Sequence, residues 1–302
     1  MRRADWLRLL LLAAIWGASF LFMRLAAPSF GPLLTGELRA LIAGGALMLW
    51  LLLLGNRPDW RAHGRVFFTI GLLNSAIPFT LYGYAALHLP ASLSVILNAT
   101  SPLFGALFSA AFLAEPLTRR ALLGLALGFA GVALISGFDE IAHGPGFWWA
   151  CAACLGASAC YGLNGVVVRR SARGVPAPHI AAASQIAAAV LLLPLALGAR
   201  PLATPGPLAW GALLALALLC SAIAYLLYYR LMQDVGPTRA LTVTFLMPAF
   251  GMLWGALFLA ETISLTMLAG AALIVAGTVL ISRAPAQASL SPPSAGSTTP
   301  VR

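Results

Sequence analysis

The sequence predicts an all-α polytopic membrane protein, with ten transmembrane helices that form two inverted five-helix repeats around a central cavity. Three observations lead to this prediction. Of the 302 residues, 61% are hydrophobic and 9% are charged, whereas a soluble domain is about 25% charged. Apolar stretches long enough to cross a bilayer follow one another along the chain. The second half of the chain also repeats the first.

The internal repeat aligns residues 98–137 with 244–283 without a gap, and 18 of the 40 positions are identical. The same offset of 146 aligns residues 72–82 with 218–228. Each copy holds five spans, and an odd number forces the second copy to enter the membrane from the opposite side. The repeats are therefore expected to be inverted. They are placed at residues 6–137 and 146–283, and a disordered cytoplasmic tail at 284–302.

The ten spans follow from hydropathy and from the turn residues between them. At a rise of about 1.5 Å per residue, each is long enough to cross the hydrocarbon layer. The first span begins after a basic start that resembles a signal peptide, but it belongs to the repeat, so we expect it to remain uncleaved. The spans are expected at residues 6–27, 34–54, 66–86, 91–113, 119–137, 146–168, 177–198, 207–230, 238–260 and 264–282.

The positive charge predicts the orientation. The net charge of +10 comes from arginine, because the sequence contains no lysine. If the N-terminus is cytoplasmic, 15 of the 18 arginines lie at that side, which is the distribution expected of cytoplasmic loops. We therefore expect both termini to be cytoplasmic, in a plasma (inner) membrane protein. The arginines then orient the helices in a lipid bilayer, and no nucleic acid is expected as a partner.

The residues that are missing exclude several functions. Without lysine the chain cannot form a Walker A loop or a lysine Schiff base. The motifs H-E-x-x-H and G-x-S-x-G do not occur. We therefore expect no enzyme activity, no cofactor and no metal site, and an energy source other than hydrolysis of ATP by the chain itself.

Several motifs carry a resemblance to a known family. They are W-G-x-S-F at 16–20, the fourth-span pattern P-L-F-G-A-L-F that ends in A-E-P-L-T, and G-x₆-G-x₂-L-I-S in the fifth and tenth spans. Over residues 6–283 the chain resembles the EamA-type carriers of the drug/metabolite transporter superfamily. The resemblance implies ten helices around a central cavity and export of metabolites, amino acids or toxic compounds. It does not name the cargo.

Prolines inside spans indicate the first candidates for substrate binding. A proline in mid-helix frees the carbonyl four residues earlier. Pro78, Pro102 and Pro248 do this within apolar spans. Because a freed carbonyl inside a membrane must find protein, water or ligand, the residues that carry these carbonyls are candidate cavity liners. They are Asn74, Asn98 and Thr244. The alternative is that neighbouring helices bind these groups and the kinks serve packing.

Other polar and aromatic side chains inside the spans extend this candidate site. Trp16 lies in mid-span rather than at an interface, so it serves either helix packing or a cavity floor. Tyr84 and Tyr225, which also lie inside spans, give weaker support to a binding site here. Aromatic walls with a few amides suit an amphipathic organic solute. The remaining candidate substrate-binding residues are Tyr82, Tyr161, Asn164, Gln185 and Tyr228.

Charges inside spans are costly and therefore informative. Arg24, Glu37 and Arg39 lie toward the outer ends of the first two spans, as candidates for a gate, for coupling or for binding a substrate carboxylate. The simpler expectation is that they extend to the headgroups or pair with one another. Glu115 and Glu261 occur in both copies. They are expected to act structurally beside helix N-termini, with proton transport as the alternative.

The sequence thus favours a secondary transporter that exports small organic metabolites by alternating access. Amino acids or related neutral or zwitterionic solutes are the expected cargo, and drugs are a further possibility. The alternatives are an anion exchanger of the sugar-phosphate or nucleotide-sugar type and a channel. Glycine-rich helix faces serve either packing within a monomer or contact in a homodimer.

Overall fold

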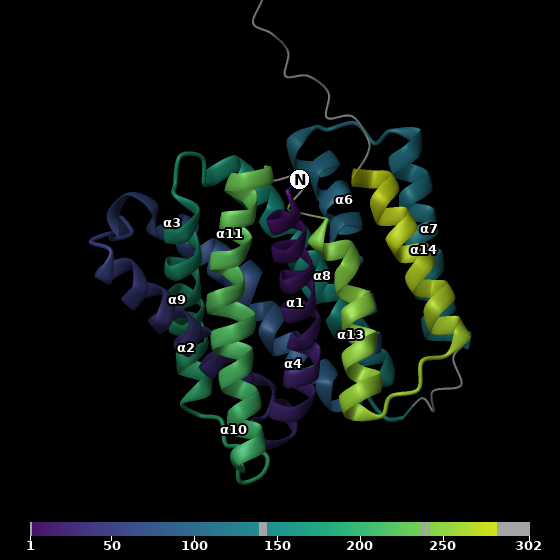
Figure 1. The fold of residues 1–302 in the computed structure, drawn as a ribbon, viewed down its shortest axis with the longest axis horizontal. Helices are drawn as coiled ribbons and strands as arrows, with labels where there is room; N and C mark the ends of the chain where they lie inside the picture. The colour runs from purple at the N-terminus through teal and green to yellow at the C-terminus, as the bar shows by residue number, and fades with distance from the viewer. Residues whose placement is uncertain (1, 139–143, 237–239, 241, 283–302) are drawn as a thin grey trace, which may run out of the picture.

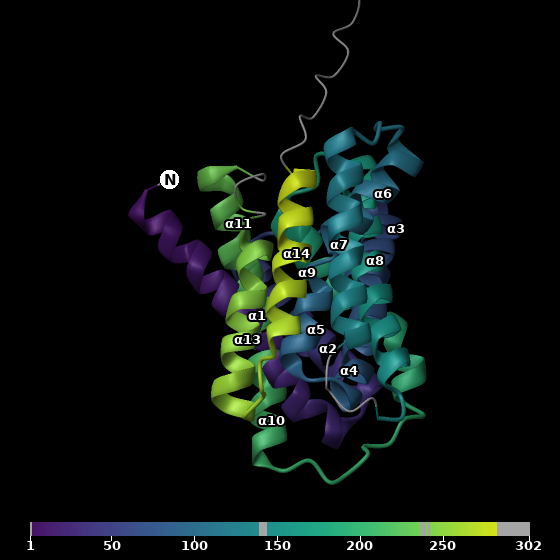
Figure 2. The same cartoon turned by 90° about the vertical axis from the view of Figure 1, so that its right-hand side faces the viewer.

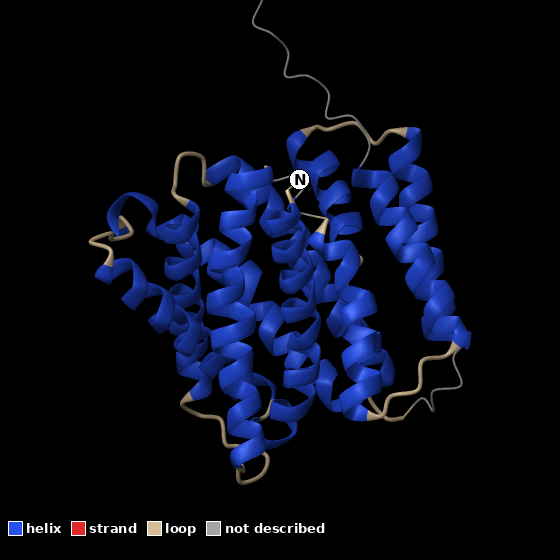
Figure 3. Cartoon of the chain, viewed as in Figure 1, coloured by secondary structure: helices blue, strands red, loops and turns tan. Residues whose placement is uncertain are grey.

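The computed structural model describes residues 2–138, 144–236, 240 and 242–282. Over these residues the secondary structure is helical, with no strand (Figure 3). Nine helical stretches are long and apolar enough to cross a membrane, and a tenth apolar helix, Val243–Leu259, is shorter. The described part of the chain is therefore an all-α polytopic membrane protein with ten spans. The predicted tail at 284–302 lies outside the described residues.

The first copy holds five spans, two of which are built from more than one helix. The predicted boundaries agree with the structure to within a few residues, except that the third span begins at Trp60 instead of residue 66. The helices are α1 (Arg3–Phe30), α2 (Pro32–Leu53), α3 (Trp60–Gly71), η1 (Leu72–Ala76), α4 (Ile77–His88), α5 (Ala91–Asn98), α6 (Ser101–Leu113) and α7 (Arg119–Phe138).

The second copy follows the same order. Its eighth span extends five residues beyond the predicted end at 230, and residues 238, 239 and 241 of the predicted ninth span lie outside the described part. The helices are α8 (Phe147–Ser171), α9 (Ala177–Ala196), α10 (Pro207–Leu214), η2 (Ala215–Ile223), α11 (Ala224–Val235), α13 (Val243–Leu259) and α14 (Leu265–Ser282).

The third span of each copy contains a π-helical segment, at η1 and at η2. In η1 the Ile77 N–H donates to the Leu72 carbonyl, five residues earlier, and in η2 Ala224 donates to Leu219. Such segments are rare and often mark functional sites. Pro78 follows η1 directly, in the first turn of α4, where proline is tolerated.

The fourth span is interrupted where the sequence predicts only a kink. α5 ends at Asn98, a turn covers Ala99 and Thr100, and α6 begins with Pro102 in its first turn. The equivalent Pro248 lies inside the continuous helix α13. The two copies thus differ at this point.

Glycines bring α7 and α14 into backbone contact, and the two helices lie side by side in both views (Figures 1 and 2). A Cβ atom on Gly124 would lie 2.6 Å from the Gly277 carbonyl oxygen, and one on Gly131 would lie 2.7 Å from that of Gly270. Gly124 is equivalent to Gly270 and Gly131 to Gly277. The contact therefore pairs each copy's first glycine with the other copy's second, as two-fold symmetry between antiparallel helices requires.

A second pair of glycine contacts joins the copies in the same way. A Cβ atom on Gly17 of α1 would lie 2.9 Å from the Gly251 nitrogen in α13. In the other contact, a Cβ atom on Gly162 of α8 would lie 2.6 Å from the Gly105 nitrogen in α6. Gly105 and Gly251 are equivalent in the repeat. Each copy's fourth span therefore packs on the first span of the other copy.

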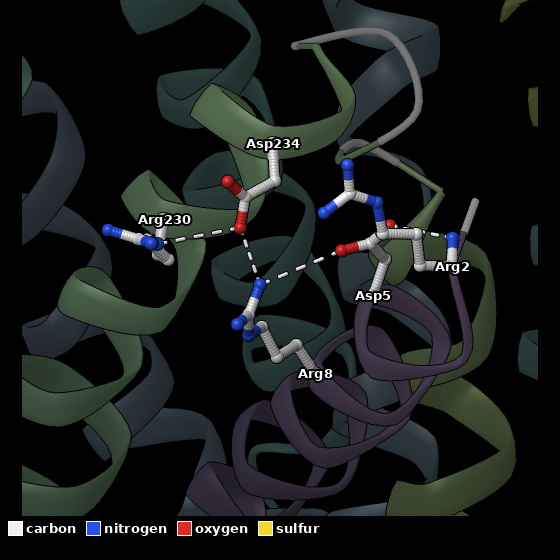
Figure 4. Close-up of polar contacts among 5 residues, drawn as sticks. All are labelled: Arg2, Asp5, Arg8, Arg230 and Asp234. Carbon is white, nitrogen blue, oxygen red and sulfur yellow. Dashed lines mark hydrogen bonds and ion pairs between the residues drawn. The ribbon is translucent and has the colours of Figure 1, made fainter.

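The N-terminal end of α1 and the C-terminal ends of α11 and α14 lie at the same end of the molecule (Figure 1). There Arg8 of α1 bonds to Asp234 of α11 at 2.5 Å and lies 3.6 Å from Asp5, while Arg230 lies 3.5 Å from Asp234 (Figure 4). The predicted basic end is thus also a small ion-pair network between the first and eighth spans.

Substitution of Gly124 by Ala is expected to lower the melting temperature of the purified protein. The new methyl group meets backbone rather than a movable side chain, so the helices must separate, at a cost of about 1–3 kcal/mol. Gly45→Ala in α2 is the matched control, because nothing lies within 4 Å of its Cβ position. Thermal unfolding in detergent measures both, and equal melting temperatures would refute the contact.

Candidate functional site

Asn74 joins the two copies at the centre of the molecule. Its amide nitrogen donates to the Tyr225 hydroxyl of α11 at 2.8 Å, and its amide oxygen accepts from Asn164 of α8 at 3.1 Å. All three side chains are half-buried. The π-helical turn of η1 therefore carries an amide from the first copy into a hydrogen-bond network with two spans of the second.

Tyr82 forms a second polar group beside the interruption of the fourth span. Its hydroxyl donates to the Asn98 amide oxygen at 2.8 Å and lies 3.2 Å from the Ser158 hydroxyl of α8. Its ring stacks on that of Tyr161, with 6.2 Å between the centroids. Asn98 and Tyr161 are half-buried, and Tyr82 is buried. Three predicted side chains, Tyr82, Asn98 and Tyr161, thus lie together with Ser158.

The carbonyls freed at the interruption are bound by protein hydroxyls. Ser101 donates to the Asn98 carbonyl at 2.7 Å, Ser158 to that of Leu97 at 3.1 Å, and Thr278 to that of Ala99 at 3.2 Å. The alternative stated for the proline kinks therefore holds for Asn98: the protein binds its carbonyl, and the side chain is what faces the polar centre.

Arg39 is buried rather than extended to the membrane surface. Its side chain is 7% exposed, its Nε donates to Ser221 of η2 at 2.9 Å, and its guanidinium lies 3.8 Å above the Phe79 ring. The side chains of Tyr161 and Tyr225 lie nearby. The expectation that it reaches the headgroups was wrong, because α2 turns this residue toward protein and not toward lipid.

The other predicted charges also do not pair with Arg39 within the described part of the chain. Glu37 is 4% exposed, and its Oε2 has no hydrogen-bond partner among the described residues. Arg24 donates to the Ala86 carbonyl at 2.5 Å, at the end of α4. The three charges therefore occupy separate positions.

The remaining predicted substrate-binding residues are Trp16, Tyr228, Gln185 and Thr244. Trp16 packs on Tyr228 with 5.2 Å between ring centroids. Gln185 of α9 is fully buried and lies near the Tyr225 hydroxyl, although its amide makes no hydrogen bond within the described residues. Thr244 is half-buried in the first turn of α13.

Two pockets open at opposite ends of the molecule. One, of about 450 Å³, lies at the end away from the termini and is lined by residues that include Arg24, His88 and Glu261. The other, of about 340 Å³, lies beside Pro176 and Tyr229. None of the nine predicted substrate-binding residues lines either pocket. In this conformation Asn74 bonds to Asn164, and Tyr82 bonds to Asn98.

Glu115 and Glu261 are equivalent in sequence but have different partners. Glu261 accepts from the backbone N–H groups of Ala91 at 2.6 Å and Ser92 at 2.9 Å, at the start of α5. Glu115 pairs with the Arg169 side chain at 2.9 Å, and both are exposed. Glu261 thus lies beside a helix N-terminus, as expected, and the helix that it caps is α5 rather than the next one along the chain. That helix, α14, is capped by Ser264.

The model of the EamA-like transporter family matches residues 6–137 and 148–283. The chain belongs to this family. Members of the EamA-like family are transporters, which agrees with the ten apolar helices and with the polar groups between the two copies.

Relatives and a solved structure agree with this assignment. The chain is 29% identical to "Uncharacterized inner membrane transporter YedA" of Escherichia coli, over 88% of this chain and 87% of the relative. It is 26% identical to "Uncharacterized transporter YvbV" of Bacillus subtilis (91% and 90%). It is 25% identical to "Probable terminal-alkyne amino-acid exporter" of Streptantibioticus cattleyicolor (94% of each). A crystal structure with 23% identity superposes with a TM-score of 0.63 over 93% of this chain and 96% of that chain, so the fold is shared.

The sequence predicts most side chains of the polar centre but not two of its serines. Ser158 and Ser221 were not predicted, since serine is common in apolar helices and carries little signal by itself. Tyr225 was noted as weak support, yet it is the partner of Asn74. The repeat contained a usable signal, because Ser221 lies in the segment 218–228 that matches 72–82.

Removal of the Asn74 amide is expected to destabilise the protein by about 1–3 kcal/mol, because Asn164 and Tyr225 each lose a buried partner. In a double-mutant cycle of Asn74→Leu and Tyr225→Phe, we expect a coupling of about 1 kcal/mol. Chemical or thermal unfolding of the four proteins measures it. Additive effects would show that the two side chains do not interact.

Glu261→Gln is expected to lower the melting temperature clearly more than Glu115→Gln. Glu261 makes two charge-assisted bonds to backbone N–H groups, each worth about 1.5–3 kcal/mol. An exposed ion pair such as Glu115–Arg169 contributes about 0–1 kcal/mol. The equivalent positions serve as controls for each other, and a larger effect at Glu115 would reverse the assignment.

Proposed function

We propose that this chain is a secondary carrier that exports small organic metabolites, amino acids or related zwitterions first among them, across the plasma (inner) membrane by alternating access. Both termini lie in the cytoplasm in this proposal, and an ion gradient or exchange supplies the energy. The family is one of transporters, and a relative that aligns over nearly the whole chain is named as an amino-acid exporter.

The observation that carries the proposal is the hydrogen-bonded centre that joins the two copies. Asn74, Asn164 and Tyr225 come from both copies and lie between pockets at opposite ends. In carriers built from repeats, the substrate site lies at the repeat interface, so that rocking one copy against the other exposes it to either side. Amides and phenols that bond to one another in this conformation can exchange those bonds for bonds to a cargo.

The composition of this centre favours a small zwitterion over a sugar phosphate. A phosphate dianion needs several cationic donors, whereas Arg39 is the one cation that the described residues place in this group. Arg24 lies in the pocket at the outer end with Glu261 nearby. The anion exchanger is therefore the less favoured candidate.

The test is counterflow in proteoliposomes that contain the purified full-length chain. Labelled amino acids added outside are expected to accumulate in vesicles loaded with the unlabelled amino acid, at an uptake rate that saturates with concentration. Asn164→Leu is expected to reduce this uptake rate at least tenfold. Asn56→Leu is the matched control, because Asn56 is exposed in a loop and its side chain donates to the nearby Leu54 carbonyl. Flux that neither saturates nor responds to the inner solute would indicate a channel. Accumulation of sugar phosphates alone would favour the anion exchanger.

A further inference from the structure

Arg39 is a buried cation for which the described part of the chain provides no counter-ion. It lies seven residues into α2, about 10 Å along the helix axis. A charge of this kind costs about 2.5–3.5 kcal/mol at the centre of a membrane helix on insertion scales. The ion pairs among the described residues involve Arg8, Arg169 and Arg230 instead.

The neighbours of Arg39 stabilise the guanidinium only in part. The Ser221 hydroxyl accepts one hydrogen bond from Nε of Arg39, and the guanidinium lies over the Phe79 ring. The phenols of Tyr161 and Tyr225 lie nearby, but neutral phenols are not counter-ions. Glu37, two residues earlier on α2, is not within ion-pair distance of Arg39. Within the described residues the two terminal nitrogens of the guanidinium make no hydrogen bond, and these are the atoms that bind a carboxylate in bidentate geometry.

Arg39, and with it the guanidinium that can bind a carboxylate, lies where the two copies meet. Phe79 belongs to the first copy and Ser221 to the second, and both Tyr161 and Tyr225 belong to the polar centre. Building on the proposed function, we propose that Arg39 binds the carboxylate of the cargo and thereby selects small monocarboxylates such as α-amino acids. The phenols and amides around it then bind the rest of the solute.

A carboxylate introduced at Ser221 would compete with such a cargo. Ser221 lies 2.9 Å from Nε of Arg39, so S221D supplies an internal counter-ion at high effective concentration. S221N has nearly the same size without the charge. If Arg39 binds the cargo carboxylate, S221D should weaken binding at least tenfold, and more than S221N does.

The experiment measures ligand-dependent thermal stabilisation of the full-length protein in detergent, with no gradient present. The probes are L-phenylalanine and L-propargylglycine, each compared with its primary amide. We expect the wild type to bind the acids at least tenfold more tightly than the amides. R39Q and S221D should lose that preference, R39K should retain part of it, and R200Q, which removes an exposed arginine, should keep it. Should S221D not fold, R39K and R39Q against the wild type decide the question.

The two proposals fail in different ways. Equal binding of acid and amide, no binding of either, or undiminished acid binding by R39Q would overturn the role of Arg39, whatever the flux. Acid-selective binding that depends on Arg39, without any flux in proteoliposomes, would support the role of Arg39 and overturn the proposed export function.

Discussion

In the hydrocarbon of a membrane each backbone N–H and C=O group needs a partner within the protein, and the arrangement of this chain depends on that requirement. Ten spans meet it as helices. At the interruption between α5 and α6 the hydroxyls of Ser101, Ser158 and Thr278 meet it instead. At η1 and η2 it is met by bonds that reach five residues back. The places where the regular helix fails are the places where polar side chains gather, because an irregular backbone and its satisfying groups must be shielded from lipid together.

The helix contacts between the two copies follow their two-fold relation, whereas several polar side chains at the centre occupy positions where the two copies differ in sequence. Glycines at equivalent positions bring α7 against α14, α1 against α13 and α6 against α8. Between these contacts the copies differ: Asn74 is equivalent to Cys220, and Asn98 to Thr244. Tyr225 is likewise equivalent to Phe79, and Arg39 to Gln185. A symmetric scaffold thus holds an asymmetric centre.

The sequence predicts most of the fold because hydropathy, arginine distribution and an internal repeat report on the same spans. It predicts Asn74, Asn98 and the tyrosines because amides and phenols are rare within membrane helices and prolines mark the irregular turns. It does not predict that η1 and η2 are π-helical, since hydropathy does not distinguish a bond to the fourth residue from one to the fifth. Nor does it predict the burial of Arg39. The rule that long cationic side chains reach the headgroups assumes a helix face toward lipid, and this face of α2 packs on protein.

The divided roles of Glu115 and Glu261 have a consequence for how such a chain evolves. Two separate, identical halves would carry the same carboxylate at both membrane faces, and any change would alter both faces at once. Joining the halves in one polypeptide removes that restriction, because each position is then fixed to one face. One carboxylate now caps a helix start, and its equivalent pairs with an arginine on the opposite side. A single polypeptide therefore lets the two surfaces of the membrane differ independently.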